Sequence, residues 1–157
     1  MATLGTDVAS IAPVGAARGT TRILLATDLT SASAAATSEA LRLAAVMHAD
    51  LLIVSVIDPA HEARTGWLTR SDQRREARTT AAQHLVGRGR QEGVRTSFLV
   101  WEGEPGPSIV EAAVSESVDL IVVGSHRRGQ VKRVLLGSVS EHVVRHAHCP
   151  VVVVPRS

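Results

Sequence analysis

The sequence has few of the residues on which several classes of protein depend. Its single cysteine, Cys149, excludes an internal disulfide framework and a zinc site built from cysteines. Tyrosine is absent, and the remaining aromatic residues are too few for the stacking platforms of single-strand nucleic-acid binders: Phe98, Trp67 and Trp101. A formal net charge of +2 gives no electrostatic case for duplex DNA either. We therefore expect no nucleic-acid partner.

Signals for membranes and secretion are also missing. The sequence has no apolar run of about 18 residues, the length at which a segment becomes a candidate membrane span. Its N-terminus lacks a basic region followed by an apolar one, which is the pattern of a secretory signal. We therefore expect a cytoplasmic protein without a membrane partner.

Apolar residues make up 45% of the 157 residues, enough to form a buried core. At about 150 residues per domain, this length predicts one domain rather than two. Residues 1–20 are rich in Ala, Gly, Thr and Ser without sustained periodicity, so we predict a flexible N-terminal tail there. The predicted domain then covers residues 21–157.

The apolar pattern beyond the tail alternates between two kinds of segment. Short apolar runs predict buried strands at 23–26, 51–57, 120–123 and 151–154, and a more alternating segment predicts a further strand near 94–101. Helical spacing predicts helices at 33–48, 71–91, 105–117 and 138–147. This order is typical of a doubly wound α/β fold with a parallel sheet. Ligands of such folds bind beyond the carboxyl ends of the strands, so residues 26–28, 55–58 and 124–126 are the candidate positions.

The segment 124–141 contains the strongest candidate for a ligand-binding site. Gly124 follows a predicted strand directly, and Gly137 stands where a helix begins; the free N–H groups of a helix N-terminus attract phosphate. Residues 124–148 hold five basic residues and one acidic residue, whereas 102–119 hold five acidic residues and no basic one. An anion site is one interpretation. The other is a capping box, in which Ser138 and Glu141 satisfy the helix donors without a ligand.

Several other patterns favour structural roles. The spacing from Gly124 to Gly129 resembles a P-loop, but Gln130-Val131 replaces the required Lys-Ser/Thr pair. The arginines between 64 and 90 are predicted to form a solvated helix face. Cys149, before a proline, is predicted to pack as a small apolar residue. His142 and His146 share a helix face without a third ligand at suitable spacing, so we predict no metal site.

Four stretches together resemble the universal stress protein family over residues 22–156: RILLATDLTSAS, LLIVSVID, VDLIVVGSH and LLGSVSEHVVRHAHCPVVVV. The resemblance implies a five-stranded parallel sheet in the order 3-2-1-4-5 with helices on both faces, the adenine nucleotide alpha hydrolase-like, Rossmann-like fold. Many members of this family bind ATP or related adenine nucleotides, and others have lost that ability.

The family's nucleotide pattern is Gly, two residues, Gly, nine residues, Gly, then Ser or Thr. Gly124 matches its first position, and Gly137 with Ser138 matches its last pair, but Arg127 stands in place of the second glycine. An arginine there either blocks the loop or turns its guanidinium onto phosphate oxygens. By resemblance, the nucleotide-binding residues are Ala26, Thr27, Asp28, Val56, Gly124, His126, Arg127, Arg128, Gly129, Gly137, Ser138, Val139 and Ser140. The implied ligand is ATP, with or without Mg²⁺, or else ADP or AMP.

Two of these residues have simpler interpretations. Asp28 would approach the ribose or adenine, but an acid after a strand is also typical of a turn or a helix cap. His126 would line the ribose and phosphates, or it is a loop histidine without a ligand.

The resemblance also implies a homodimer through Val151–Val154, because the last strand lies at an edge of the implied sheet and an apolar edge needs cover. The sequence shows no catalytic set. We therefore expect a dimeric nucleotide-binding module of the stress response that acts on an unidentified regulatory protein. Two alternatives remain: a dimeric interaction protein whose pocket Arg127 closes, and a slow ATPase.

Overall fold

The computed structural model describes residues 19–64, 71–125 and 136–156, so most of the predicted N-terminal tail lies outside the described residues. The described elements follow the predicted alternation of strands and helices. They are β1 (Arg22–Ala26), a 3-10 turn η1 (Ser31–Ser33), α1 (Ala34–Met47), β2 (Asp50–Ile57), α2 (Pro59–Arg64), α3 (Ser71–Gln91), β3 (Thr96–Glu102), α4 (Pro105–Ser115), β4 (Leu120–Gly124), α5 (Ser138–His146) and β5 (Val151–Val154). No described helix is long and apolar enough to cross a bilayer.

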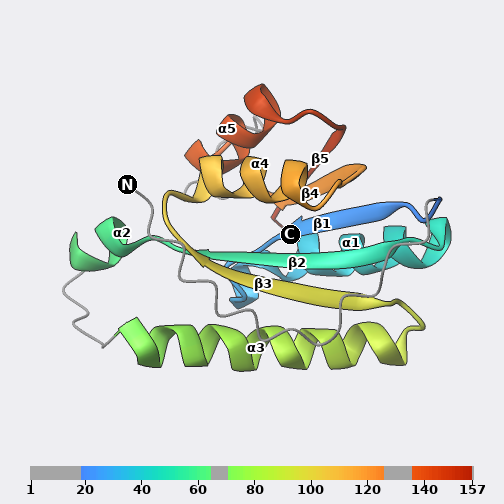
Figure 1. Cartoon of the computed structure of the whole chain (residues 1–157), viewed down its shortest axis with the longest axis horizontal. Helices are drawn as coiled ribbons and strands as arrows, with labels where there is room; N and C mark the ends of the chain where they lie inside the picture. The colour runs from blue at the N-terminus through green and yellow to red at the C-terminus, as the bar shows by residue number, and fades with distance from the viewer. Residues whose placement is uncertain (1–18, 65–70, 126–135, 157) are drawn as a thin grey trace.

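The strands form one five-stranded sheet in the order β3-β2-β1-β4-β5, and every neighbouring pair is parallel. This result confirms the predicted fold and strand order. The order reverses at β1, which pairs with β2 on one side and with β4 on the other (Figure 1). The reversal leaves space beyond the carboxyl ends of β1 and β4, where parallel sheets bind ligands.

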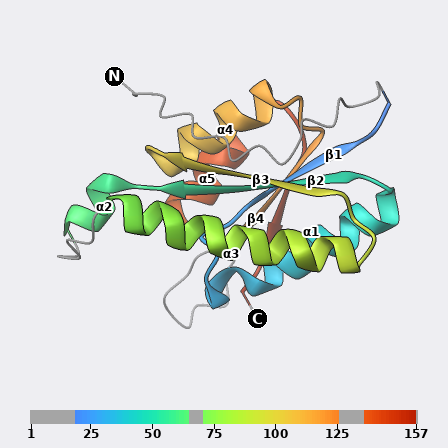
Figure 2. The same ribbon diagram turned by 60° about the horizontal axis from the view of Figure 1, so that its bottom comes forward.

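Helices cover both faces of the sheet, and each face has its own core. Leu24 and Ala26 of β1 pack with apolar residues of α4 and α5, whereas Ile23 and Leu25 pack with α1. Figure 2 shows α4 on one side of the strands and α1 and α3 on the other, and Figure 1 shows α5 on the side of α4. Because successive side chains of a strand point to opposite faces, a strand covered on both faces must be apolar throughout. This explains the unbroken apolar runs of the sequence.

Some element boundaries differ from the predicted ones. The predicted helix 105–117 ends at Ser115, and Ser117 adopts a left-handed φ of 52° that a helix cannot continue. The short helix α2 was not predicted. Asp58 precedes its first residue, and the Asp58 Oδ1 accepts hydrogen bonds from the N–H groups of Ala60 at 2.9 Å and His61 at 3.2 Å. The helix extends beyond the carboxyl end of β2 (Figure 1), so it adds a wall at the end of the sheet where ligands bind.

Candidate functional site

A cavity of about 560 Å³ lies at the carboxyl ends of β1, β2 and β4. All the predicted nucleotide-binding residues that the structure describes line it: Ala26, Thr27, Asp28, Val56, Gly124, Gly137, Ser138, Val139 and Ser140. The remaining predicted residues, His126, Arg127, Arg128 and Gly129, lie outside the described residues. Residues far apart in the sequence are thus brought together at the point where the strand order reverses.

The turn after β1 is held by its own polar side chains. Asp28 Oδ1 accepts hydrogen bonds from the N–H of Thr30 at 3.0 Å and from its hydroxyl at 2.8 Å. The Ser33 hydroxyl also donates to Asp28 Oδ1 at 3.0 Å, and it lies 2.7 Å from Thr27 Oγ1. Leu29 adopts a left-handed φ of 62°, and its N–H donates to Thr27 Oγ1. Asp28 therefore has the turn role that its position suggested, and it lines the cavity as well.

The N-terminus of α5 opens on the same cavity. Gly137 is its N-cap and provides no side-chain acceptor, and Ser138 is already the first helical residue. The predicted capping box is therefore wrong: Ser138 stands one position too late to cap, and the Glu141 carboxylate instead pairs with Arg145 at 2.9 Å. The N–H of Glu141 bonds to the Gly137 carbonyl at 2.8 Å. The N–H groups before it, of residues 138–140, have no acceptor within the helix.

A second helix, α4, also begins at the cavity, but it is unsuited to an anion. Its N-cap is Glu104, a carboxylate, and its first turn contains Pro105 and Pro107, which have no N–H to donate. Of these two helices, α5 therefore provides the main-chain donors for an anion. The cavity thus has one helix N-terminus that suits an anion, at residues 137–140, and one that repels it, at Glu104.

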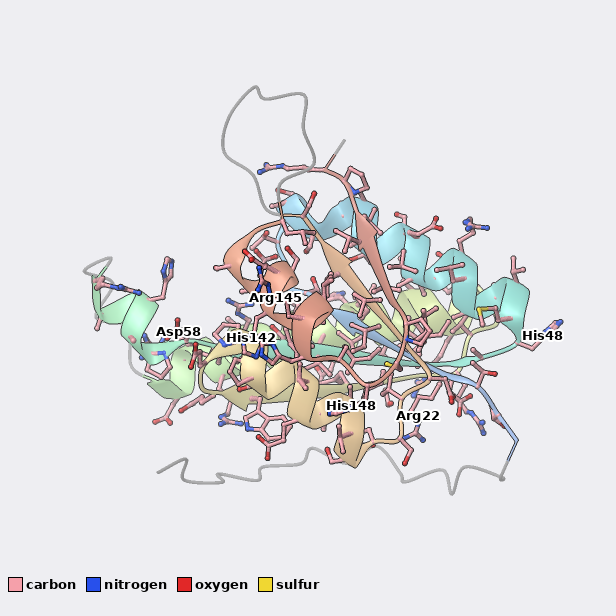
Figure 3. All side chains as sticks on the ribbon, turned by 90° about the horizontal axis from the view of Figure 1, so that it is seen from above. Arg22, His48, Asp58, His142, Arg145 and His148 are labelled. Atoms are coloured by element: carbon pink, nitrogen blue, oxygen red, sulfur yellow. The ribbon has the colours of Figure 1, made fainter. Side chains whose placement is uncertain are left out.

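The two helices touch closely at the edge of the cavity. Gly106 is buried, and a Cβ added to it would lie 2.8 Å from the Cβ and Cγ of His142. In Figure 3 the His142 side chain lies where α5 meets α4, and Asp58 lies at the start of α2 on the same side of the molecule. The rings of His142 and His146 stack at 4.1 Å, and His146 Nδ1 lies 2.8 Å from the His142 carbonyl oxygen. Within the described ranges, no three His, Cys, Asp or Glu side chains are grouped as metal ligands.

Asp58, at the end of the candidate segment 55–58, lines the cavity, but sequence reasoning missed several other residues that do so: His61, Arg64, Arg78, Glu104 and His142. The prediction of a solvated arginine face on α3 is wrong for Arg75 and Arg78, which are half-buried and face the sheet. Arg75 donates to the Val100 carbonyl at 3.4 Å and to Glu102 at 3.3 Å. A signal was present, because both arginines continue the helical stripe of the buried Ala82 and Val86.

Cys149 packs against the core on the α4 and α5 side of the sheet, as predicted for a small apolar residue. Burial raises the pKa of its thiol above the ordinary value, and the negative charge of Asp119 raises it further. A thiol with a raised pKa is a poor nucleophile near neutral pH. The cysteine therefore has a structural role.

Comparison with known proteins assigns the family. The sequence model of the Universal stress protein family matches residues 19–155. A universal stress protein of Methanocaldococcus jannaschii is 32% identical over 139 residues, which are 86% of this chain and 82% of that protein. One universal stress protein, solved in complex with cAMP, aligns with a TM-score of 0.65 and 24% identity over 88% of this chain and 98% of its own. The universal stress protein of Archaeoglobus fulgidus, solved with dAMP, aligns with a TM-score of 0.64 and 20% identity over 85% of this chain and 97% of its own. The chain therefore belongs to the universal stress protein family.

Proposed function

We propose that this protein binds an adenine nucleotide in the cavity and acts as a regulatory module switched by occupancy of that site. One observation carries the proposal: the uncapped N-terminus of α5 opens on a cavity at the point where the strand order reverses. Main-chain N–H groups and the helix dipole together attract phosphate. Members of the family solved with cAMP and with dAMP support an adenine nucleotide as the ligand class.

The two helix N-termini at the cavity suggest how a nucleotide lies in it. The phosphates would meet the N–H groups of residues 138–140, because the N-terminus of α4 carries the Glu104 carboxylate and two prolines that have no N–H. The base and ribose would then lie toward Asp28 and Val56, at the ends of β1 and β2. The sequence from 127 to 133 contains four basic residues, which favours a ligand with more phosphate charge. We therefore propose ATP as the ligand, with Mg²⁺ as a companion of its phosphates, and ADP or AMP as weaker ligands.

Calorimetric titration with ATP, ADP and AMP, each with and without Mg²⁺, tests this proposal. The decisive variant is Ser138→Pro, which removes one N–H at the first helical position, where proline is tolerated. Its neighbour Gly137 is extended, at φ −69° and ψ 165°, which suits the residue before a proline. Losing one hydrogen bond to a charged group should weaken binding about tenfold or more. The matched variant, Ser138→Ala, removes only the hydroxyl and keeps the N–H, so it should bind more tightly than Ser138→Pro if the main-chain donor contributes.

A further variant, Arg127→Gly, restores the family pattern and separates the two interpretations of that arginine. Equal binding by the natural protein and this variant supports the proposal. Binding by the variant alone would instead favour an interaction protein whose pocket the arginine closes. If neither protein bound any adenine nucleotide, the proposed function would be wrong.

We also propose a homodimer formed through β5. This strand is an edge of the sheet, and in the described part of the chain it pairs only with β4. The carbonyls of Pro150 and Val154 accept hydrogen bonds from the N–H groups of Ile121 in β4, at 3.0 Å, and of Ser125 just after β4, at 2.9 Å. Because every second residue of a strand faces the same neighbour, Val152 belongs to this set, and the backbone groups of Val151 and Val153 face the open edge. A second copy of the strand, related by a two-fold axis, would pair with those groups.

Light scattering on the variant Val153→Pro tests the dimer. Proline removes an N–H from the open edge and leaves the hydrogen bonds to β4 intact, so we expect a folded monomer. The control, Val153→Thr, keeps the N–H and the branched shape and should remain dimeric. A monomeric natural protein, or a dimeric proline variant, would argue against this interface.

A further inference from the structure

Helix α3 is attached to the sheet in two different ways along its length. Its C-terminal half packs through apolar groups, with Ala82 and Val86 buried. Its N-terminal half is attached through arginine side chains. Arg75 reaches β3, where it contacts Val100 and Glu102, and Arg78 reaches the ends of β1 and β2. The strength of a guanidinium hydrogen bond depends on its distance and direction. Each arginine therefore holds particular backbone and side-chain groups near the carboxyl ends of the strands.

Arg78 joins two parts of the cavity wall. Its Nη1 donates to the backbone carbonyl of Asp28 and, at 3.0 Å, to the hydroxyl of Ser55. Ser55 lies within β2 and is fully buried, with 0% of its surface exposed. Asp28, by contrast, lies in the turn beyond β1, next to a residue in the left-handed conformation. One guanidinium nitrogen therefore ties a turn that lines the cavity to a rigid point of the sheet.

The contact also explains why an arginine is suited to this position. A planar guanidinium presents several fixed donors and stays charged at every physiological pH. Its positive charge lies beside the turn that carries the Asp28 carboxylate, and Arg78 itself lines the cavity. The turn has internal hydrogen bonds among residues 27–33, and the Thr27 N–H bonds to the Val54 carbonyl. Arg78 adds a second connection between the turn and β2. It holds the carbonyl of Asp28, the residue after Thr27.

We infer that Arg78 is a positioning residue of the nucleotide site, which fixes the turn at Asp28 so that the base and ribose find their contacts already formed. This inference rests on the proposed function. A site held in its binding geometry loses less conformational entropy when the ligand enters. Removing the guanidinium should therefore weaken nucleotide binding although Arg78 need not contact the phosphates.

The test compares Arg78→Gln with Arg75→Gln by calorimetric titration of ATP. Arg75 is a matched control because it is also half-buried, lies one turn earlier on α3 and donates to a backbone carbonyl, but of β3 rather than of the turn. We expect the Arg78 variant to bind about tenfold more weakly, the equivalent of one charged hydrogen bond, and the Arg75 variant to bind almost normally. Amide hydrogen exchange should be faster at residues 29–33 in the Arg78 variant alone.

A double-mutant cycle with Asp28→Ala tests whether Arg78 acts through the turn. That substitution keeps the carbonyl that Arg78 binds but removes the carboxylate that accepts hydrogen bonds from Thr30 and Ser33, so it loosens the turn independently. If Arg78 acts by fixing the turn, Arg78→Gln should cost less affinity in this background. Equal losses with and without Asp28, or equal losses from both arginine variants, would overturn the inference. So would unchanged affinity and exchange in the Arg78 variant. Failure of the natural protein to bind nucleotide would instead overturn the proposed function, and the inference with it.

Discussion

The buried hydroxyl groups of the candidate site need hydrogen-bond partners within the protein, because water does not reach them. Ser33 is 3% exposed, and its Oγ lies within 3.0 Å of Thr27 Oγ1, Asp28 Oδ1 and the Thr30 carbonyl oxygen. Replacing Ser33 with alanine leaves these groups short of a partner. We expect Ser33→Ala to lower the free energy of unfolding by about 1–3 kcal/mol, measured by urea denaturation.

The adjacent Ser31 provides the control for this change. It is exposed and lies in the same 3-10 turn, so Ser31→Ala should change the free energy of unfolding by no more than about 0.5 kcal/mol. Equal effects of the two substitutions would show that the buried hydroxyl cluster does not stabilise the turn.

The pKa of Cys149 leads to a prediction of reactivity. Burial and the charge of Asp119 raise this pKa, so at any pH near 8 less thiolate is present than in an ordinary cysteine. We expect the folded protein to react with a disulfide reagent more slowly than the urea-unfolded chain. Because burial is the larger cause, Asp119→Asn should accelerate the reaction less than unfolding does. Equal rates for the folded and unfolded chain would contradict this account.

Single residues also show what sequence patterns can reveal about a site. Asp28 was found because it follows a strand, and Gly137 because it precedes a helix. The apolar pattern of the sequence indicates where both elements end or begin. The role of Arg78 was missed because an arginine-rich helix resembles a solvated one. The side of a helix that faces the sheet depends on its packing, which the buried Ala82 and Val86 reveal in the structure.

The contact between α4 and α5 depends on the absence of a side chain at Gly106. A Cβ at this position would lie 2.8 Å from the Cβ and Cγ of His142, closer than carbon atoms approach. The His142 Cβ is fixed to the backbone of α5, so the two helices would have to separate. We expect Gly106→Ala to lower the free energy of unfolding by about 1–3 kcal/mol, although alanine favours helices.

Gly87, inside the C-terminal half of α3, is the matched control for this steric argument. A Cβ added there meets no atom within 4 Å, so only helix propensity acts. Gly87→Ala should therefore raise the free energy of unfolding by up to about 1 kcal/mol. If both substitutions changed stability in the same direction, the contact between Gly106 and His142 would not limit the packing of the helices.

At the level of helices and strands, the sequence predicted the long elements well because their apolar patterns have a physical cause. Strands covered on both faces must be apolar throughout, so β1, β2, β4 and β5 stood out. The short helix α2 is too brief for a periodic pattern and depends on a cap at Asp58. Helix ends such as Ser115 depend on a left-handed residue, and non-glycine residues in that conformation have a weak sequence signal.

The arrangement of the whole molecule was predicted through the family resemblance, and the strand order confirms it. The alternation of strands and helices by itself indicated a doubly wound sheet but left the strand order open. The contrast between the two helix N-termini at the cavity was not foreseen. It depends on α4 and α5 beginning at the same place, with Pro105 and Pro107 on one helix and Gly137 on the other.

The proposed dimer predicts that the stability of the protein depends on its concentration. If the native state is a pair of chains joined at β5, dilution favours unfolded single chains by mass action. A hundredfold dilution should cost the dimer about 2.7 kcal/mol, which lowers the thermal midpoint by a few degrees. The variant Val153→Pro, which disrupts the open edge of β5, should have a midpoint that does not change with concentration. Calorimetric scans of both proteins across that range measure the effect. A midpoint of the natural protein that stays constant on dilution would contradict a native dimer joined at β5, because unfolding would then involve no dissociation.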